Sequence, residues 1–119
     1  MANRLQTIAG DTSGQPFSRD LQEPAYAATI AISPNSGSTV IKPGTLTGAA
    51  TINATVTDCK ANDEITLVLT ADGSGPYNVT PGTGFVDGGV IAVAASKQAT
   101  WTGIFDGTAF VEKARFVEP

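Results

Sequence analysis

Histidine, the side chain that most often moves protons at neutral pH, does not occur in the 119-residue sequence. Its absence removes the usual general base, the usual proton shuttle and the commonest metal ligand together. No Ser-His-Asp or Cys-His catalytic group can therefore be built from one chain. The single cysteine, Cys59, precedes Lys60, whose charge is expected to lower the thiol pKa slightly. A half-buried structural cysteine is the interpretation that we favour, and one cysteine allows no intramolecular disulfide.

The eleven acidic residues are the other candidates for acid–base chemistry, since a glycosidase needs only two carboxylates. Five of them stand beside Gly or Asn or at the edge of an apolar run: Asp58, Asp63, Asp72, Asp87 and Asp106. Aspartate is common in turns because its side chain bonds nearby backbone groups. Residues 72–75 lack the further carboxylates of a calcium loop, and residues 82–84 lack the third glycine and the Lys-Ser/Thr pair of a phosphate loop. We predict no catalytic residue, no cofactor and no metal site.

Three aromatic residues near the C-terminus allow two interpretations. Trp101, Phe105 and Phe110 could form an exposed platform on which a sugar stacks. Aromatic residues at alternating strand positions of a small β-domain more often fill its core. We therefore expect these three side chains to be buried.

Short β-strands are the elements expected to position all of these residues. Ala, Val, Ile and Thr dominate the apolar and β-branched content, and thirteen Gly and seven Pro divide the chain into short pieces. The period of two is clearest at Ile65, Leu67 and Leu69. About eight strands are predicted, over residues 26–32, 38–42, 46–56, 64–70, 77–80, 90–95, 99–105 and 109–116. Their regular spacing predicts an all-β fold, a small antiparallel β-sandwich or barrel.

Turn sequences suggest how some strands connect. Asp106-Gly107-Thr108 lies between two alternating runs and predicts a hairpin. Residues 34–37 form a second turn cluster, after which residues 38–42 are a plausible return strand. The segment 90–95 is apolar on both faces, which suits a central strand or one that another subunit covers.

Residues 1–25 differ from the β-domain that we assign to residues 26–119. The apolar residues of this segment, together with Tyr26 directly after it, are isolated and follow neither a helical nor a strand period: Leu5, Ile8, Phe17, Leu21 and Tyr26. One interpretation is a frayed terminus. The other is an extended N-terminal arm whose spaced apolar anchors dock on a neighbouring subunit and become ordered there.

Charge and hydropathy exclude several partners. The net charge is −4, and the seven Lys and Arg residues are scattered, so neither a nucleic acid nor an anionic membrane surface is an expected partner. No apolar run is long enough for a signal peptide or a membrane-spanning helix. We therefore expect synthesis in the cytoplasm.

The order of elements between Asp63 and Phe116 is distinctive. An apolar strand over 65–71 precedes a Gly-rich turn, which Tyr77-Asn78-Val79-Thr80 and Gly82-Thr83-Gly84-Phe85 follow. A Thr-Trp strand, Phe105-Asp106-Gly107-Thr108 and Phe110-Val111-Glu112 complete the order. It resembles the small β-domain of tailed-bacteriophage virion proteins, in head decoration or head-fibre proteins and in tail-fibre segments.

The resemblance implies a virion structural role without catalysis, commonly as a homotrimer. The chain has no heptads, collagen-like run or repeats, so it suits a capsid decoration (cement) protein that binds the major capsid protein on the outer capsid surface better than a long fibre. The alternative is a receptor- or glycan-binding knob of a head or tail fibre, which an exposed aromatic patch including Trp101 or Tyr77 would favour. A small enzyme is a third alternative, for which the sequence offers no motif.

Overall fold

The computed structural model describes residues 19–35, 37–86 and 89–119, and within these ranges the chain is all-β. The described residues form nine strands and no helix, which confirms the predicted fold class. The strands are β1 (Arg19–Gln22), β2 (Thr29–Ile32), β3 (Ser38–Ile41), β4 (Ala50–Ala54), β5 (Glu64–Thr70), β6 (Tyr77–Pro81), β7 (Ile91–Val93), β8 (Gln98–Phe105) and β9 (Phe110–Val117).

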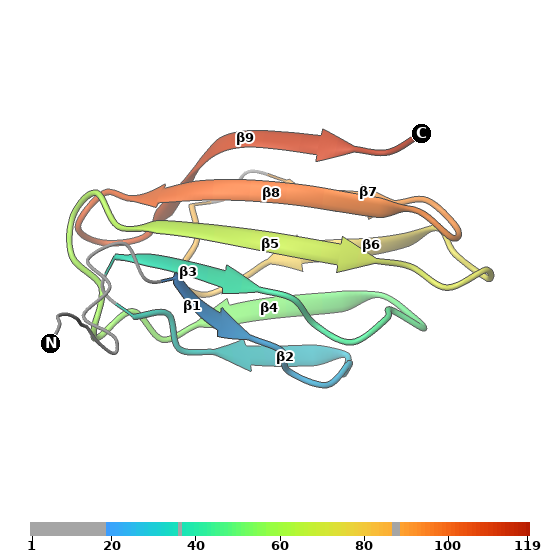
Figure 1. Ribbon diagram of the computed structural model, residues 1–119, viewed down its shortest axis with the longest axis horizontal. Coiled ribbons are helices and arrows are strands. Elements are labelled where there is room, and N and C mark those ends of the chain that lie inside the picture. Colours follow the sequence, from blue (N-terminus) through green and yellow to red (C-terminus); the bar gives the residue numbers. More distant parts are fainter. Residues whose placement is uncertain (1–18, 36, 87–88) are drawn as a thin grey trace, which may run out of the picture.

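The strands form two sheets that pack face to face and do not close into a barrel (Figure 1). The first sheet has five strands in the order β1-β3-β5-β8-β9, and it lies in front in Figure 1. The second has four strands in the order β2-β4-β6-β7 and lies behind the first. Of the two architectures that the sequence allowed, the structure is the sandwich.

Both sheets are mixed rather than antiparallel, which corrects the prediction. β1, β3 and β5 pair in parallel, as do β2, β4 and β6, while β7, β8 and β9 join as antiparallel strands. The cause is that the chain changes sheet at every step from β1 to β6. Parallel neighbours need a crossover connection, and here a strand of the opposite sheet serves as that crossover. The chain therefore passes from β2 into the other sheet, and β3 is not the return strand of β2.

The predicted hairpin between β8 and β9 is confirmed. The two strands pair from Ala99 opposite Val117 to Phe105 opposite Phe110. At the turn, Asp106 Oδ1 accepts hydrogen bonds from the backbone N–H groups of Thr108 and Ala109, at 2.8 and 2.9 Å. Gly107 has a φ of +104°, a conformation that a residue without Cβ adopts readily.

The core lies between the two sheets and is built from the inward-facing alternate positions. In β5 these are Ile65, Leu67 and Leu69, which are at most 1% exposed, as the period of two predicted. The aromatic residues join them: Trp101 and Phe110 are fully buried and Phe105 is 4% exposed. A fourth ring, that of Phe85, lies edge-on to the Trp101 ring at 5.5 Å and packs against Phe110, which in turn packs against Phe105. The core interpretation of the aromatic residues is confirmed.

Two segments differ from their predicted places. β1 lies inside the segment assigned to the arm, where Arg19–Gln22 pairs with β3 at the edge of the five-stranded sheet. Four residues with one large apolar side chain carry too weak a pattern to predict a strand. β7, within the predicted strand 90–95, is an edge strand of the second sheet, so the assignment as a central strand is wrong, and the alternative, cover by another subunit, stays a prediction.

Candidate interaction surfaces

The proposed arm anchors divide into three groups. Leu5, Ile8 and Phe17 lie outside the described residues. Leu21, in β1, points out from the five-stranded sheet and is 55% exposed, so it is free to contact a partner. Tyr26 instead packs against the core, and its hydroxyl donates a 2.9 Å hydrogen bond to the Ala49 carbonyl, so its side chain is engaged within its own chain.

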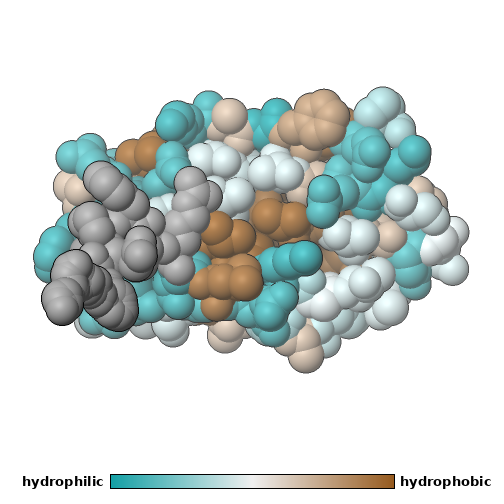
Figure 2. Space-filling model, in the orientation of Figure 1, coloured by the Kyte–Doolittle hydropathy of each residue, from teal (hydrophilic) through white to brown (hydrophobic). Residues whose placement is uncertain are grey.

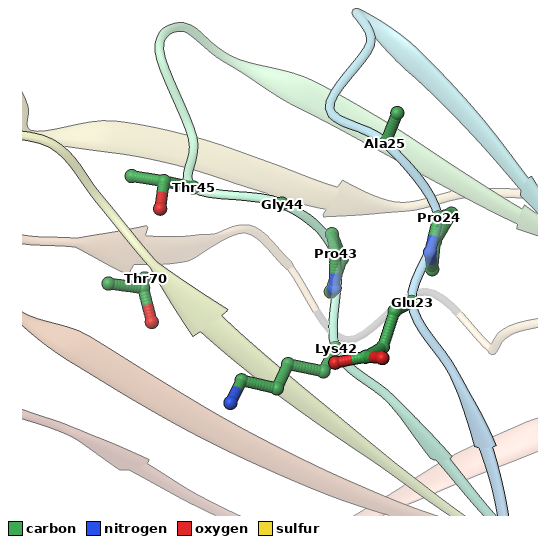
Figure 3. A pocket seen from close by; sticks show the side chains of 8 residues that line it. All are labelled: Glu23, Pro24, Ala25, Lys42, Pro43, Gly44, Thr45 and Thr70. Carbon is green, nitrogen blue, oxygen red and sulfur yellow. The ribbon is translucent and has the colours of Figure 1, made fainter.

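A hollow of about 370 Å³ lies where the chain leaves β1 and β3 (Figure 3). Its walls are the segments 23–25 and 42–45, with Thr70 of β5 at one side. Two backbone hydrogen bonds hold these segments together, from Lys42 N to the Gln22 carbonyl and from Gly44 N to the Pro24 carbonyl. Figure 3 shows the Lys42 side chain extending away from the Glu23 carboxylate. The hollow offers hydroxyl and single charged groups but no nucleophile paired with a base.

Of the five acidic residues predicted to serve turns, Asp63, Asp72 and Asp106 accept hydrogen bonds from backbone N–H groups in turns. Asp63 Oδ2 accepts a 2.7 Å hydrogen bond from Lys60 N, and Asp72 Oδ1 accepts from Ser74 N and from the Tyr77 hydroxyl. The bond to Asp72 raises the pKa of Tyr77, because it stabilises the protonated phenol. Asp87 lies outside the described residues. Within the described ranges, no group of three or more Asp, Glu or Cys residues is placed to hold a metal ion.

Cys59 is half-buried beside the core, as predicted, and its Sγ lies 3.5 Å from the Pro34 carbonyl. Burial raises the pKa of its thiol, and the negative charges of Asp63 and Asp58 raise it further. The lowering by Lys60 that the sequence suggested is not found: the causes of the shift are burial and two carboxylates, and all of them raise the pKa. The thiol is suited to packing rather than to nucleophilic chemistry.

An inward-facing ion pair lies within β9, and one of its partners also bonds the residue that precedes β7 in the other sheet. Arg115 donates to both carboxylate oxygens of Glu112, at 2.8 and 2.7 Å, and its Nη1 donates to the Val90 carbonyl at 2.9 Å. The Glu112 pKa is lowered, chiefly by Arg115 and additionally by the buried indole N–H of Trp101. That N–H is buried and has no hydrogen-bond partner of ordinary geometry among the described residues. Inward-pointing charge of this kind blocks the pairing of a further strand at an edge.

The outer faces of the two sheets differ in chemistry. On the four-stranded sheet, the outward positions hold only small or polar side chains, as expected of a face in water. They are Thr29 and Ala31 in β2, Thr51 and Asn53 in β4, Asn78 and Thr80 in β6, and Ala92 in β7.

On the five-stranded sheet, large apolar side chains occupy outward positions of every strand. They are Leu21, Val40, Val68, Ile104, Val111 and Phe116, with threonines between them. We call this surface the outer β-face. Strand register places Leu21 beside Val40, and places Val68, Thr100 and Phe116 in one cross-strand row. Figure 2 shows apolar surface gathered near the middle of this face. Contiguous apolar surface marks an interaction site, whereas single exposed apolar residues are ordinary.

Charge is scarce on the outer β-face, and a hollow adjoins its most exposed side chain. Across β8, Glu64 and Lys113 form an ion pair at 3.3 Å, so these two opposite charges cancel. Phe116 is 65% exposed and stands beside a hollow of about 170 Å³, which Thr100, Thr102, Ala114 and Arg115 also line. The face therefore carries both a protruding ring and a depression.

Sequence reasoning missed the outer β-face, although one signal for it was present. In β5, Leu67-Val68-Leu69 are three consecutive apolar residues, so the strand is apolar on both faces at its middle. The alternation of Ile65, Leu67 and Leu69 indicates only which residues face the core. On the other side of the sheet, Thr66, Thr100 and Thr102 look like ordinary water-facing residues until the register places them among apolar neighbours.

None of the described segments forms a helix long and apolar enough to span a membrane. A scan against models of known protein families finds no match for the chain, and a search of curated proteins finds no match either.

Proposed function

We propose that this chain is a non-catalytic virion structural protein, a bacteriophage capsid decoration protein that binds the outer surface of the major capsid protein. The proposal combines the resemblance between residues 63 and 116 with the all-β body. The observation that carries it is the position of β1: the chain enters the body at an edge strand, immediately after the residues that contain Leu5, Ile8 and Phe17. A segment attached at an edge can be added or removed without disturbing the core.

In this role the body is a compact knob and residues 1–18 are the attachment. A cement subunit adds buried area across the seams between capsid subunits, so the shell better resists internal pressure. If copies act together, as in the homotrimer that the resemblance implies, each attached arm raises the effective concentration of the next. Weak single contacts then give a stable decoration.

Copy number tests this proposal directly. Quantitative mass spectrometry of purified phage particles should find the chain at hundreds of copies per particle if it decorates the capsid. A handful of copies would favour the alternative, a receptor- or glycan-binding knob of a fibre. Absence from the particles would overturn both. The buried ring of Trp101 gives the glycan alternative no stacking surface at that residue.

The arm is tested separately by deletion and by matched substitutions. The deletion should remove residues 2–18 and keep β1, because removal of β1 would expose the backbone of β3. We expect the deletion, and the triple variant Leu5→Ser, Ile8→Ser, Phe17→Ser, to lose binding to capsids that lack the protein. The matched variant Asn3→Ala, Gln6→Ala, Thr12→Ala should bind as the wild type does. Undiminished binding by the deletion variant, with its far-UV circular dichroism preserved, would refute the arm hypothesis.

A further inference from the structure

We infer that the outer β-face of the five-stranded sheet is a contact surface between two copies of this chain, packed face to face about a two-fold axis. The inference is independent of the proposed function, because it holds for the chain whether or not it belongs to a virion. It starts from the difference between the two outer faces: one carries Thr, Asn and Ala, and the other carries six large apolar side chains.

The edges of the sheets are poor sites for self-association, which leaves the face. β1 and β2 have four residues each and β7 has three, so each offers few free backbone groups. β9 has eight residues, but Arg115 ties its inner side to Val90, and a bulge opposite Thr102 and Gly103 interrupts its register. Bulges and inward charges discourage the addition of a strand.

Charge favours a second copy over a charged partner. The chain as a whole is acidic, with a net charge of −4, so most pairings of two copies would bring like charges together. On the outer β-face, Glu64 and Lys113 neutralise each other. This pair adds no net charge to the face, so it neither repels a second copy nor attracts a partner selected by charge.

Shape also favours a second copy. A two-fold contact uses the same patch on both subunits, so a protrusion on one must meet a depression of the same patch on the other. Phe116 is the protrusion, and the hollow beside Thr100 and Thr102 is the depression. Each Phe116 ring can then enter the hollow of the opposite copy.

The area sets the expected strength. Five strands about 4.8 Å apart and three cross-strand rows about 6.8 Å apart span roughly 500 Å² in projection. A standard stable interface takes about 800 Å² of accessible surface from each partner. Side-chain relief adds to the projected area, so the face lies at the lower end of that range. We expect a dimer with a dissociation constant on the order of micromolar, not an obligate dimer.

Sedimentation velocity of the full-length chain over a wide concentration range tests the inference. We expect the wild type to pass from monomer to dimer, and added salt not to weaken the dimer because the contact is apolar. Phe116→Glu should raise the dissociation constant at least tenfold with an unchanged circular dichroism spectrum. Thr80→Glu is the matched control on the other outer face, and it should leave association unchanged.

Three other outcomes overturn the inference, and one, hexamers that Phe116→Glu disrupts, supports it. A chain that stays monomeric at all concentrations has no such contact. A trimer that Phe116→Glu does not affect is joined through another surface, whereas trimers that pair through this face would give hexamers sensitive to the substitution. If the chain is monomeric but Phe116→Glu abolishes binding to purified capsids, the occupant of the face is the capsid protein and not a second copy.

Discussion

Gly103 is a core position where the addition of one methyl group should be costly. It lies in β8, two residues after Trp101, and both residues face the interior. A Cβ at residue 103 would stand 2.6 Å from Cη2 and Cζ3 of the indole and 3.2 Å from the Val111 carbonyl oxygen. The indole therefore lies along the strand over the space that a side chain at residue 103 would occupy.

The cost of Gly103→Ala follows from what must move. Carbon atoms pack comfortably at about 3.5–4.0 Å, so the indole would have to withdraw by roughly 1 Å. It is fully buried and lies edge-on to Phe85, and interiors are too closely packed to yield freely. Overpacking of this kind costs about 1–3 kcal/mol, which exceeds the 0.5–1 kcal/mol that loss of a strand glycine returns. We expect a net loss of about 1–2 kcal/mol.

Urea unfolding followed by far-UV circular dichroism measures this loss. Tryptophan fluorescence would not serve, because the Trp101→Phe variants used below lack the single tryptophan. Gly73→Ala is the matched control, because its new Cβ would meet only Ser96 Oγ, at 3.6 Å, and its stability should change by no more than about 0.5 kcal/mol. In a Trp101→Phe background, which lacks Cη2 and Cζ3, Gly103→Ala should cost less by about 1 kcal/mol. A Gly103→Ala variant as stable as the wild type, or equal costs in both backgrounds, would refute the steric argument.

Three further predictions concern other parts of the body. Phe110→Ala should lower the free energy of unfolding by about 3–5 kcal/mol in the same assay, whereas Phe116→Ala, at a 65% exposed position, should change it by less than about 0.5 kcal/mol; similar losses would contradict the assigned burial. The pKa of Asp106 is lowered from its ordinary 3.8 by backbone N–H groups, so its contribution to the free energy of unfolding is complete above that pH and is lost as the pH falls through the folded pKa. In urea titrations at pH 7 and pH 3, the free energy of unfolding should therefore fall less for Asp106→Asn than for the wild type, and equal falls would contradict this contribution. The raised pKa of Cys59 should make iodoacetamide alkylation at pH 7.5 slower in the folded chain than in urea, and equal rates would contradict its burial.

The sequence predicted those features that depend on local pattern. Strand β5 was predicted over its full length because apolar residues recur at every second position, at Ile65, Leu67 and Leu69. The structure buries these three residues and leaves the residues between them less buried. The β8–β9 hairpin was predicted because Asp106-Gly107 lies between two alternating runs, and in the structure these two strands are neighbours in one sheet. In each case the signal and the structure involve the same short stretch of chain.

The missed features depend on how distant segments pair. Alternation tells which side chains of a strand face inward, but not which strand lies beside it, so the parallel pairing of β1, β3 and β5 could not be predicted. The same reason hid the outer β-face, whose apolar residues come from five strands and meet only through the register. Three of the proposed arm anchors, Leu5, Ile8 and Phe17, lie outside the described residues, and their role stays a prediction.

The asymmetry between the two outer faces is not a consequence of composition. Only 15% of the residues are charged, so a shortage of charge by itself would leave both faces equally apolar. The four-stranded sheet instead meets water with Asn53 and Asn78 and with threonines, whereas the five-stranded sheet places Val68 and Phe116 at equivalent outward positions. These apolar residues are not required by the core, because each strand already buries its alternate residues. A partner on the outer β-face accounts for them. A second copy of the chain fits best, because each copy presents both the Phe116 ring and the hollow beside Thr100 that could receive the ring of the other copy.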